Sequence, residues 1–186
     1  MNARFATGIC LGVTLLTGAT AAEPFRSGPP VGSELPGTFE PLNVTGPDAG
    51  EKTCIFCEYG ASPVALVFAR DISEPLTRLI RRLDEATARQ KEKGLASSAV
   101  FLSNEAPLAK KLKELAAREK IQHTILRTYR AEGPKNYNLA PEAEVTVILF
   151  VDRVVKASHA FKKGNLKEKD IEAVIVDLAK VLPGKK

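Results

Sequence analysis

Residues 63–69 read PVALVFA, and this uninterrupted apolar run decides the fold. Such a run is typical of a strand that is buried on both faces, because neither face then needs polar side chains. Ser73 follows closely and can cap a helix, and Pro75 suits the first turn of that helix, where its missing N–H costs little. The stretch therefore predicts a central strand that leads directly into a helix.

The same alternation continues towards the C-terminus. Apolar residues recur at helical spacing after Pro75, and Gly94 is typical of the end of that helix. Residues 98–102 predict a second buried strand, residues 104–119 a second helix and residues 121–128 a third strand. Strands that alternate with helices in this way favour an α/β fold.

The last part of the chain predicts a hairpin and a final helix. Residues 145–151 and 154–161 are two apolar stretches that turn at Asp152 and Arg153, without the glycine that two-residue hairpins favour. Residues 167–182 carry apolar side chains on one helical face. A hairpin added to parallel strands gives a mixed sheet, so we expect an α/β sandwich around a central mixed β-sheet.

The first 22 residues predict a secretory signal peptide. Arg4 stands near the start, a mainly apolar run covers residues 5–16, and small residues fill 18–22. The run is shorter than the roughly 20 apolar residues that a membrane span needs. We therefore expect export to the periplasm or the extracellular space, with no membrane span left after residues 1–22 are cleaved.

The remaining chain fits one domain with a leading segment. Residues 23–50 are rich in proline and glycine, and we expect them to join partly in the fold, ahead of a domain at 51–186. Hydrophobic residues make up 44% of the 186, which is enough to supply a core. The net charge of +5 comes from basic residues mixed with acidic ones, a pattern typical of solvated helix faces, so we expect no nucleic-acid partner.

Two cysteines outside the predicted signal peptide carry the chemistry. Cys54 and Cys57 can close a small disulfide ring, or share a thiolate with each lowering the pKa of the other. An even number of cysteines suits an oxidising compartment. Lys52 favours a thiolate there, whereas Glu51 and Glu58 oppose one. We take Cys54 and Cys57 as candidate catalytic residues for exchange with protein thiols or disulfides, with Cys54 attacking and Cys57 resolving.

The order of the predicted elements resembles that of the thioredoxin-like superfamily, in particular its redoxin branch, over about residues 31–182. The strings that carry the resemblance are VGSELP at 31–36 with Phe39, VFAR at 67–70, and VTVILF at 145–150 continuing to Phe161, Gly164 and Leu166. The resemblance implies a thioredoxin-like three-layer sandwich with a central mixed sheet. For the exchange hypothesis at Cys54 and Cys57 we expect no cofactor.

The chain departs from the family pattern at the standard redox site. The family's Cys-x-x-Cys follows the central strand, where this chain has Ser73-Glu74-Pro75-Leu76. The family's cis-proline would fall near Val145, and the nearest proline, Pro141, comes a few residues too early. Cys54 and Cys57 precede the central strand instead. Unless the loop folds back, we expect them towards the end of the sheet opposite the usual active site.

Two alternatives stay open for Cys54 and Cys57. The first is a structural disulfide that pins the leading segment in a thioredoxin-like module, which binds a partner protein without catalysis. The second, less favoured, is a copper or zinc site completed by His123 or His159. Neither histidine lies in a string that matches metal-binding relatives, and His159 fits a ring hydrogen-bonded beneath the last helix. We therefore assign no metal ligand.

Overall fold

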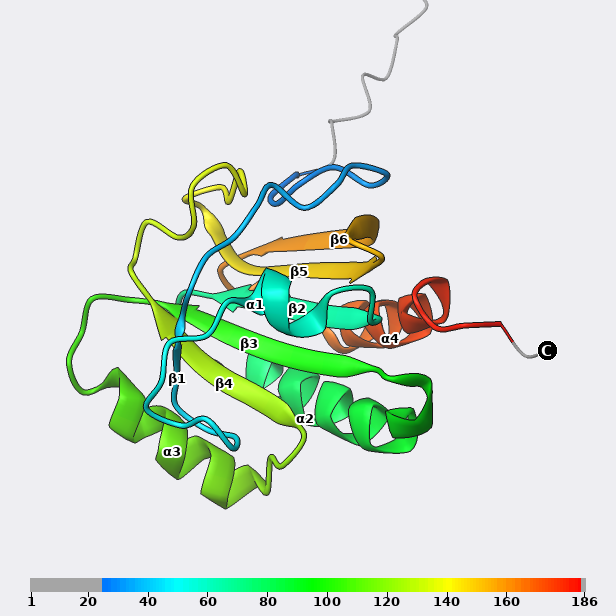
Figure 1. Ribbon diagram of the computed structural model, residues 1–186. Coiled ribbons are helices and arrows are strands. Elements are labelled where there is room, and N and C mark those ends of the chain that lie inside the picture. The colour runs from blue at the N-terminus through cyan, green and yellow to red at the C-terminus, as the bar shows by residue number, and fades with distance from the viewer. Residues whose placement is uncertain (1–24, 185–186) are drawn as a thin grey trace, which may run out of the picture.

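The computed structural model describes residues 25–184, so the predicted signal peptide at 1–22 lies outside the described residues. A six-stranded sheet forms the centre, with the strands in the order β1-β4-β3-β2-β5-β6 (Figure 1). The strands are β1 (Leu42–Asn43), β2 (Val64–Ala69), β3 (Ala96–Leu102), β4 (Thr124–Tyr129), β5 (Ala143–Val151) and β6 (Val154–Lys162). The helices are α1 (Ile55–Tyr59), α2 (Glu74–Arg89), α3 (Leu108–Glu119) and α4 (Glu168–Asp177), with short 3₁₀ helices η1 (Lys91–Lys93) and η2 (Leu178–Lys180). Within residues 25–184, none of the helices is long and apolar enough to cross a bilayer.

The sheet is mixed, and its longer helices share one face. β2, β3 and β4 run parallel, whereas β1, β5 and β6 run antiparallel to their neighbours. Both crossovers, β2-α2-β3 and β3-α3-β4, step in the same direction across the sheet, so right-handed connections place α2 and α3 on the same face. α4 packs on that face too. Every residue of β2 is buried, as the PVALVFA run predicts.

The opposite face of the sheet is covered by α1 and by extended chain. Leu35 and Phe39 of the leading segment, Ile55 of α1 and Tyr137 between β4 and β5 are buried there. Figure 1 shows α1 in front of the strands and α2 behind them. These layers confirm the α/β sandwich with a central mixed sheet, although the third layer holds a single short helix.

The outer edge of β1 is covered by the chain that follows it. Leu42 forms a bridge with Lys52, and the backbone N–H of Asn43 donates to the carbonyl oxygen of Glu51 at 2.9 Å. On its other side β1 pairs with β4, where Asn43 lies opposite Arg127. The polypeptide therefore turns back on itself after β1, and this turn brings the start of α1 beside β4.

Element boundaries shift where a local residue forces them. α3 begins at Leu108, four residues later than predicted, because Pro107 takes the N-cap position and disfavours helix before it. Gly94 ends η1 with a φ of 74°, after α2 itself has stopped at Arg89. The hairpin turns at Asp152 and Arg153 as predicted, and both adopt positive φ, 51° and 65°, as two-residue hairpin turns require.

Candidate functional site

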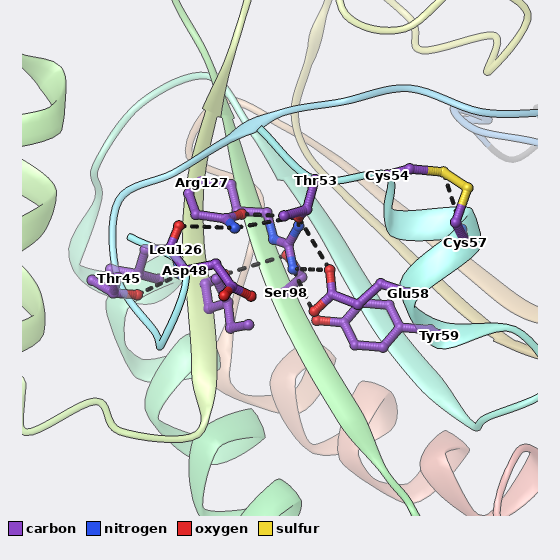
Figure 2. Close-up of polar contacts among 12 residues, drawn as sticks. Thr45, Asp48, Thr53, Cys54, Cys57, Glu58, Tyr59, Ser98, Leu126 and Arg127 are labelled. Carbon is purple, nitrogen blue, oxygen red and sulfur yellow. Dashed lines mark hydrogen bonds and ion pairs between the residues drawn. A yellow bond between two sulfur atoms is a disulfide. The ribbon is translucent and has the colours of Figure 1, made fainter. Parts of the chain in front are cut away.

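Cys54 and Cys57 form a disulfide at the start of α1 (Figure 2). Cys54 is the N-cap residue of the helix, and its Sγ accepts a hydrogen bond from the backbone N–H of Cys57 at 3.1 Å. Cys54 is half-buried, whereas Cys57 is exposed. Cys57 is therefore the cysteine that a thiol in solution meets first.

Contacts at both ends hold α1 on the sheet. Ile55 is buried in the core of this face. The guanidinium of Arg153, in the β5–β6 turn, lies 4.5 Å from the ring centre of Phe56. In the same turn, the backbone N–H of Asp152 donates to the carbonyl oxygen of Ala61 at 3.4 Å. The helix is thus fixed between the sheet face and the β5–β6 hairpin.

A buried arginine ties α1 to β4. The side chain of Arg127 is fully buried, and its Nη1 donates to Thr53 Oγ1 at 2.6 Å. Its Nη2 donates to Glu58 Oε2 at 2.8 Å and to the hydroxyl of Tyr59 at 3.1 Å (Figure 2). Its Nε has no hydrogen-bond partner within residues 25–184. One guanidinium therefore holds residues on both sides of the disulfide.

This ion pair changes the electrostatic expectation for a thiolate. The sequence presents Glu58 as a charge that opposes a thiolate, but Arg127 compensates its carboxylate. Sequence reasoning missed Arg127 and Tyr59. The signal in the sequence is an arginine inside an otherwise uncharged strand, because a strand with buried faces accepts such a charge only when it has a partner.

The family's standard redox position lies on the other face of the sheet. Ser73 has the extended backbone of an N-cap residue, yet its hydroxyl makes no cap hydrogen bond and lies buried without a partner among residues 25–184. Leu76 is buried in the core beneath α2. None of the peptide bonds in residues 25–184 is cis. The segment before β2 folds back, so the disulfide is displaced across the sheet and not simply to its far end.

Burial shifts the ionisation of two tyrosines on the α1 face. It raises the pKa of Tyr59 to about 12, against the positive charge of Arg127, which lowers it; Glu58 adds a smaller upward contribution. Burial also raises the pKa of Tyr137, whose hydroxyl donates to the carbonyl oxygen of Gly37 at 3.0 Å. Both phenols therefore stay protonated well above the pH at which an exposed tyrosine ionises.

We expect the free energy of unfolding to be unaffected by these tyrosines below about pH 10 and to fall as the pH rises from about 10 towards 12. The unfolded chain loses the phenol protons first, so base favours unfolding. Urea unfolding across this range measures the loss, and absorbance at 295 nm follows the phenols directly. We expect the free energy of unfolding of Tyr59→Phe to fall less steeply with pH than that of the parent protein. An identical slope in Tyr59→Phe would contradict the shifted pKa of Tyr59.

The ring of His159 and the backbone of His123 each have a partner other than the cysteines. Nε2 of His159 lies 3.1 Å from Oδ2 of Asp177 on α4, which confirms a ring hydrogen-bonded beneath the last helix. The backbone N–H of His123 donates to Oδ1 of Asp84 on α2 at 2.7 Å. In the part of the chain that the structure describes, no group of three or more His, Cys, Asp or Glu side chains is placed to hold a metal ion.

Comparison with known proteins identifies the fold. No protein-family model and no curated protein matches the chain. Among solved structures, a proposed thiol:disulfide interchange protein DsbE from Chlorobium tepidum is 18% identical with a TM-score of 0.63, over 82% of this chain and 98% of that one. A proposed protein disulfide isomerase from Bacteroides thetaiotaomicron is 10% identical with a TM-score of 0.65, over 85% and 94%. A 2-Cys peroxiredoxin from Plasmodium vivax is 17% identical with a TM-score of 0.57, over 78% and 80%. The architecture of this chain is therefore the thioredoxin-like fold that these redoxin-like proteins share.

Proposed function

We propose that this protein is an exported thiol–disulfide exchange protein that works through Cys54 and Cys57. The observation that carries the proposal is a Cys-x-x-Cys disulfide whose second cysteine, Cys57, is exposed on a thioredoxin-like fold. Export is supported by the signal-like sequence at 1–22 and by the disulfide itself, because disulfides persist in oxidising compartments.

The exchange proceeds in two displacements. A substrate thiolate attacks Sγ of Cys57, the bond between the two cysteines breaks, and Cys54 leaves as a thiolate. A second thiolate of the substrate then attacks the mixed disulfide, so the substrate departs as a disulfide and Cys57 is released as a thiolate. Two electrons thus pass from a substrate dithiol to the protein, and the reverse sequence reduces a substrate disulfide.

The roles of the two cysteines follow from their surroundings. Cys57 is the partner of the substrate because it is the exposed one. Cys54 is the better leaving group, because the backbone N–H of Cys57 donates to its sulfur and stabilises the thiolate. This order is the reverse of the sequence-based hypothesis, in which Cys54 attacks.

Arg127 contributes by position and not by contact with the substrate. It holds Thr53 on one side of the disulfide and Glu58 on the other. Because these contacts do not involve the sulfurs, α1 keeps its place on the sheet when the disulfide opens. A fold that persists through reduction is what repeated exchange requires.

The test is whether the disulfide exchanges while the protein stays folded. The purified protein is equilibrated in dithiothreitol buffers of graded potential, free thiols are alkylated and counted by mass spectrometry, and circular dichroism follows the fold. We expect reversible reduction of one disulfide with unchanged circular dichroism. A disulfide that opens only when the protein unfolds would overturn the function and favour a structural disulfide in a partner-binding module.

A further inference from the structure

A pocket of about 640 Å³ opens between the leading segment and the ends of β3 and β4. Phe39 and Tyr129 form an aromatic wall, with their ring centres 5.4 Å apart in an edge-on arrangement. Lys52 and Arg130 line the pocket as well, and the guanidinium of Arg130 lies 5.2 Å from the ring centre of Tyr129. The pocket thus combines aromatic side chains with two cations.

Neither cation of the pocket forms an ion pair in the part of the chain that the structure describes. Within residues 25–184, no carboxylate lies at ion-pair distance from Lys52 or Arg130, and neither side chain donates a hydrogen bond there. Several other surface arginines are paired, as Arg82 is with Glu172 at 2.6 Å, whereas the exposed Arg153 also has no ion pair among residues 25–184. The cations of the pocket are therefore available to an anionic ligand.

Two further polar side chains of the pocket keep donor groups unused. Asn104 Oδ1 accepts from the backbone N–H of Ala131 at 3.1 Å, which leaves its amide N–H groups unused. Ser103 Oγ accepts from the backbone N–H of Glu105 at 3.1 Å, which leaves its hydroxyl proton unused. The lining contains one acidic side chain, the exposed Glu40. A ligand rich in acceptors, with carboxylates above all, matches this set.

The pocket adjoins the segment that leads into the disulfide, although neither cysteine lines it. Lys52 comes two residues before Cys54, so their Cα atoms are at most about 7 Å apart. Phe39 of the pocket wall belongs to the same buried cluster as Ile55, the first residue of α1. Lys52 thus joins the pocket to the segment that carries the proposed exchange site.

We propose that this pocket selects acidic peptide thiols and disulfides as substrates of the exchange. Arg130 and Lys52 bind carboxylates of the peptide, the aromatic wall packs against its backbone, and Glu40 accepts from its N–H groups. The proposal rests on the proposed function for the identity of the substrate. The binding of an acidic peptide, however, is measurable without any exchange.

The kinetic test compares three small disulfides of different charge. Reduced protein is mixed with oxidised glutathione (anionic), bis(2-hydroxyethyl) disulfide (neutral) or cystamine (cationic), and formation of the protein disulfide is timed. We expect oxidised glutathione to react about 20-fold faster than cystamine at low salt, and the ratio to shrink as salt is added. The double variant Lys52→Glu/Arg130→Glu inverts the preference.

A matched control separates the pocket from the overall charge. Lys91→Glu/Lys93→Glu makes the same change in net charge on exposed residues of η1, outside the pocket. We expect this control to keep the preference for oxidised glutathione. An equal loss of preference in both double variants would overturn the proposal, because the preference would then come from net charge alone.

The binding test uses S-methylglutathione, which carries the two carboxylates but cannot exchange. We expect calorimetry to detect binding to the parent protein and to the η1 control, and none to Lys52→Glu/Arg130→Glu. Exchange with all three disulfides at equal rates, without binding of S-methylglutathione, would show that the pocket does not select acidic substrates. The proposed exchange function would then still hold. Binding of S-methylglutathione without any exchange would support the pocket as a binding site for acidic peptides and would overturn the proposed exchange function.

Discussion

Cys54→Ser accumulates a stable mixed disulfide on Cys57, whereas Cys57→Ser forms its mixed disulfide much more slowly. In Cys54→Ser the exposed sulfur still meets substrate, but no second thiolate is present to resolve the intermediate. In Cys57→Ser the remaining sulfur is half-buried at the N-cap of α1, and we expect it to react at least about tenfold more slowly. Mass spectrometry of each variant after incubation with oxidised glutathione gives both the yield and the rate.

Ser73→Ala is the control for this pair of variants. Ser73 holds the place of the family's first cysteine but lies on the opposite face of the sheet from α1. We expect its exchange rate to match that of the parent protein. Faster trapping through Cys54 than through Cys57 would reverse the assignment of roles, and a loss of exchange in Ser73→Ala would move the site to α2.

Glu58→Ala destabilises the protein by about 3 kcal/mol, more than Arg127→Met does. Removal of Glu58 leaves the charge of Arg127 in a fully buried site with hydroxyl partners alone. Removal of the arginine leaves a carboxylate whose side chain is 29% exposed and can turn to water, so we expect a cost of about 1–2 kcal/mol. Urea unfolding of the oxidised proteins measures both values.

The double variant Arg127→Met/Glu58→Ala tests whether the uncompensated charge of Arg127 causes the loss of stability in Glu58→Ala. We expect it to be more stable than Glu58→Ala alone, because the uncompensated guanidinium is gone. Glu85→Ala removes a carboxylate from an exposed ion pair with Arg89 and serves as the control, with an expected change below about 1 kcal/mol. Additive losses in the double variant would argue against a strong ion pair.

Much of the fold could be predicted because its signals are local. The apolar run in β2 and the helical spacing in α2 and α4 each read correctly from short windows. The third layer could not be predicted in the same way. Leu35 and Tyr137 are single apolar residues in irregular chain, and contacts with distant strands bury them.

In the candidate site, too, the features with local signals could be predicted and those that depend on distant contacts could not. Spacing alone identifies Cys54 and Cys57 as a pair. Their unequal exposure depends on which side of α1 packs on the sheet, and that is set by the burial of Ile55 and by Arg127. The five residues of α1 are too few to show a helical period, so a helix at this place carries no signal in the sequence.

The anchor between Arg127 and Glu58 has a consequence for the order of assembly. The two residues lie 69 positions apart, and a helix of five residues does not persist by itself. α1 is therefore secured late, after β3 and β4 have paired and the intervening loop has closed. During synthesis the cysteines emerge long before their arginine. An oxidant that acts on the growing chain thus meets both thiols in the open, before the fold shields Cys54.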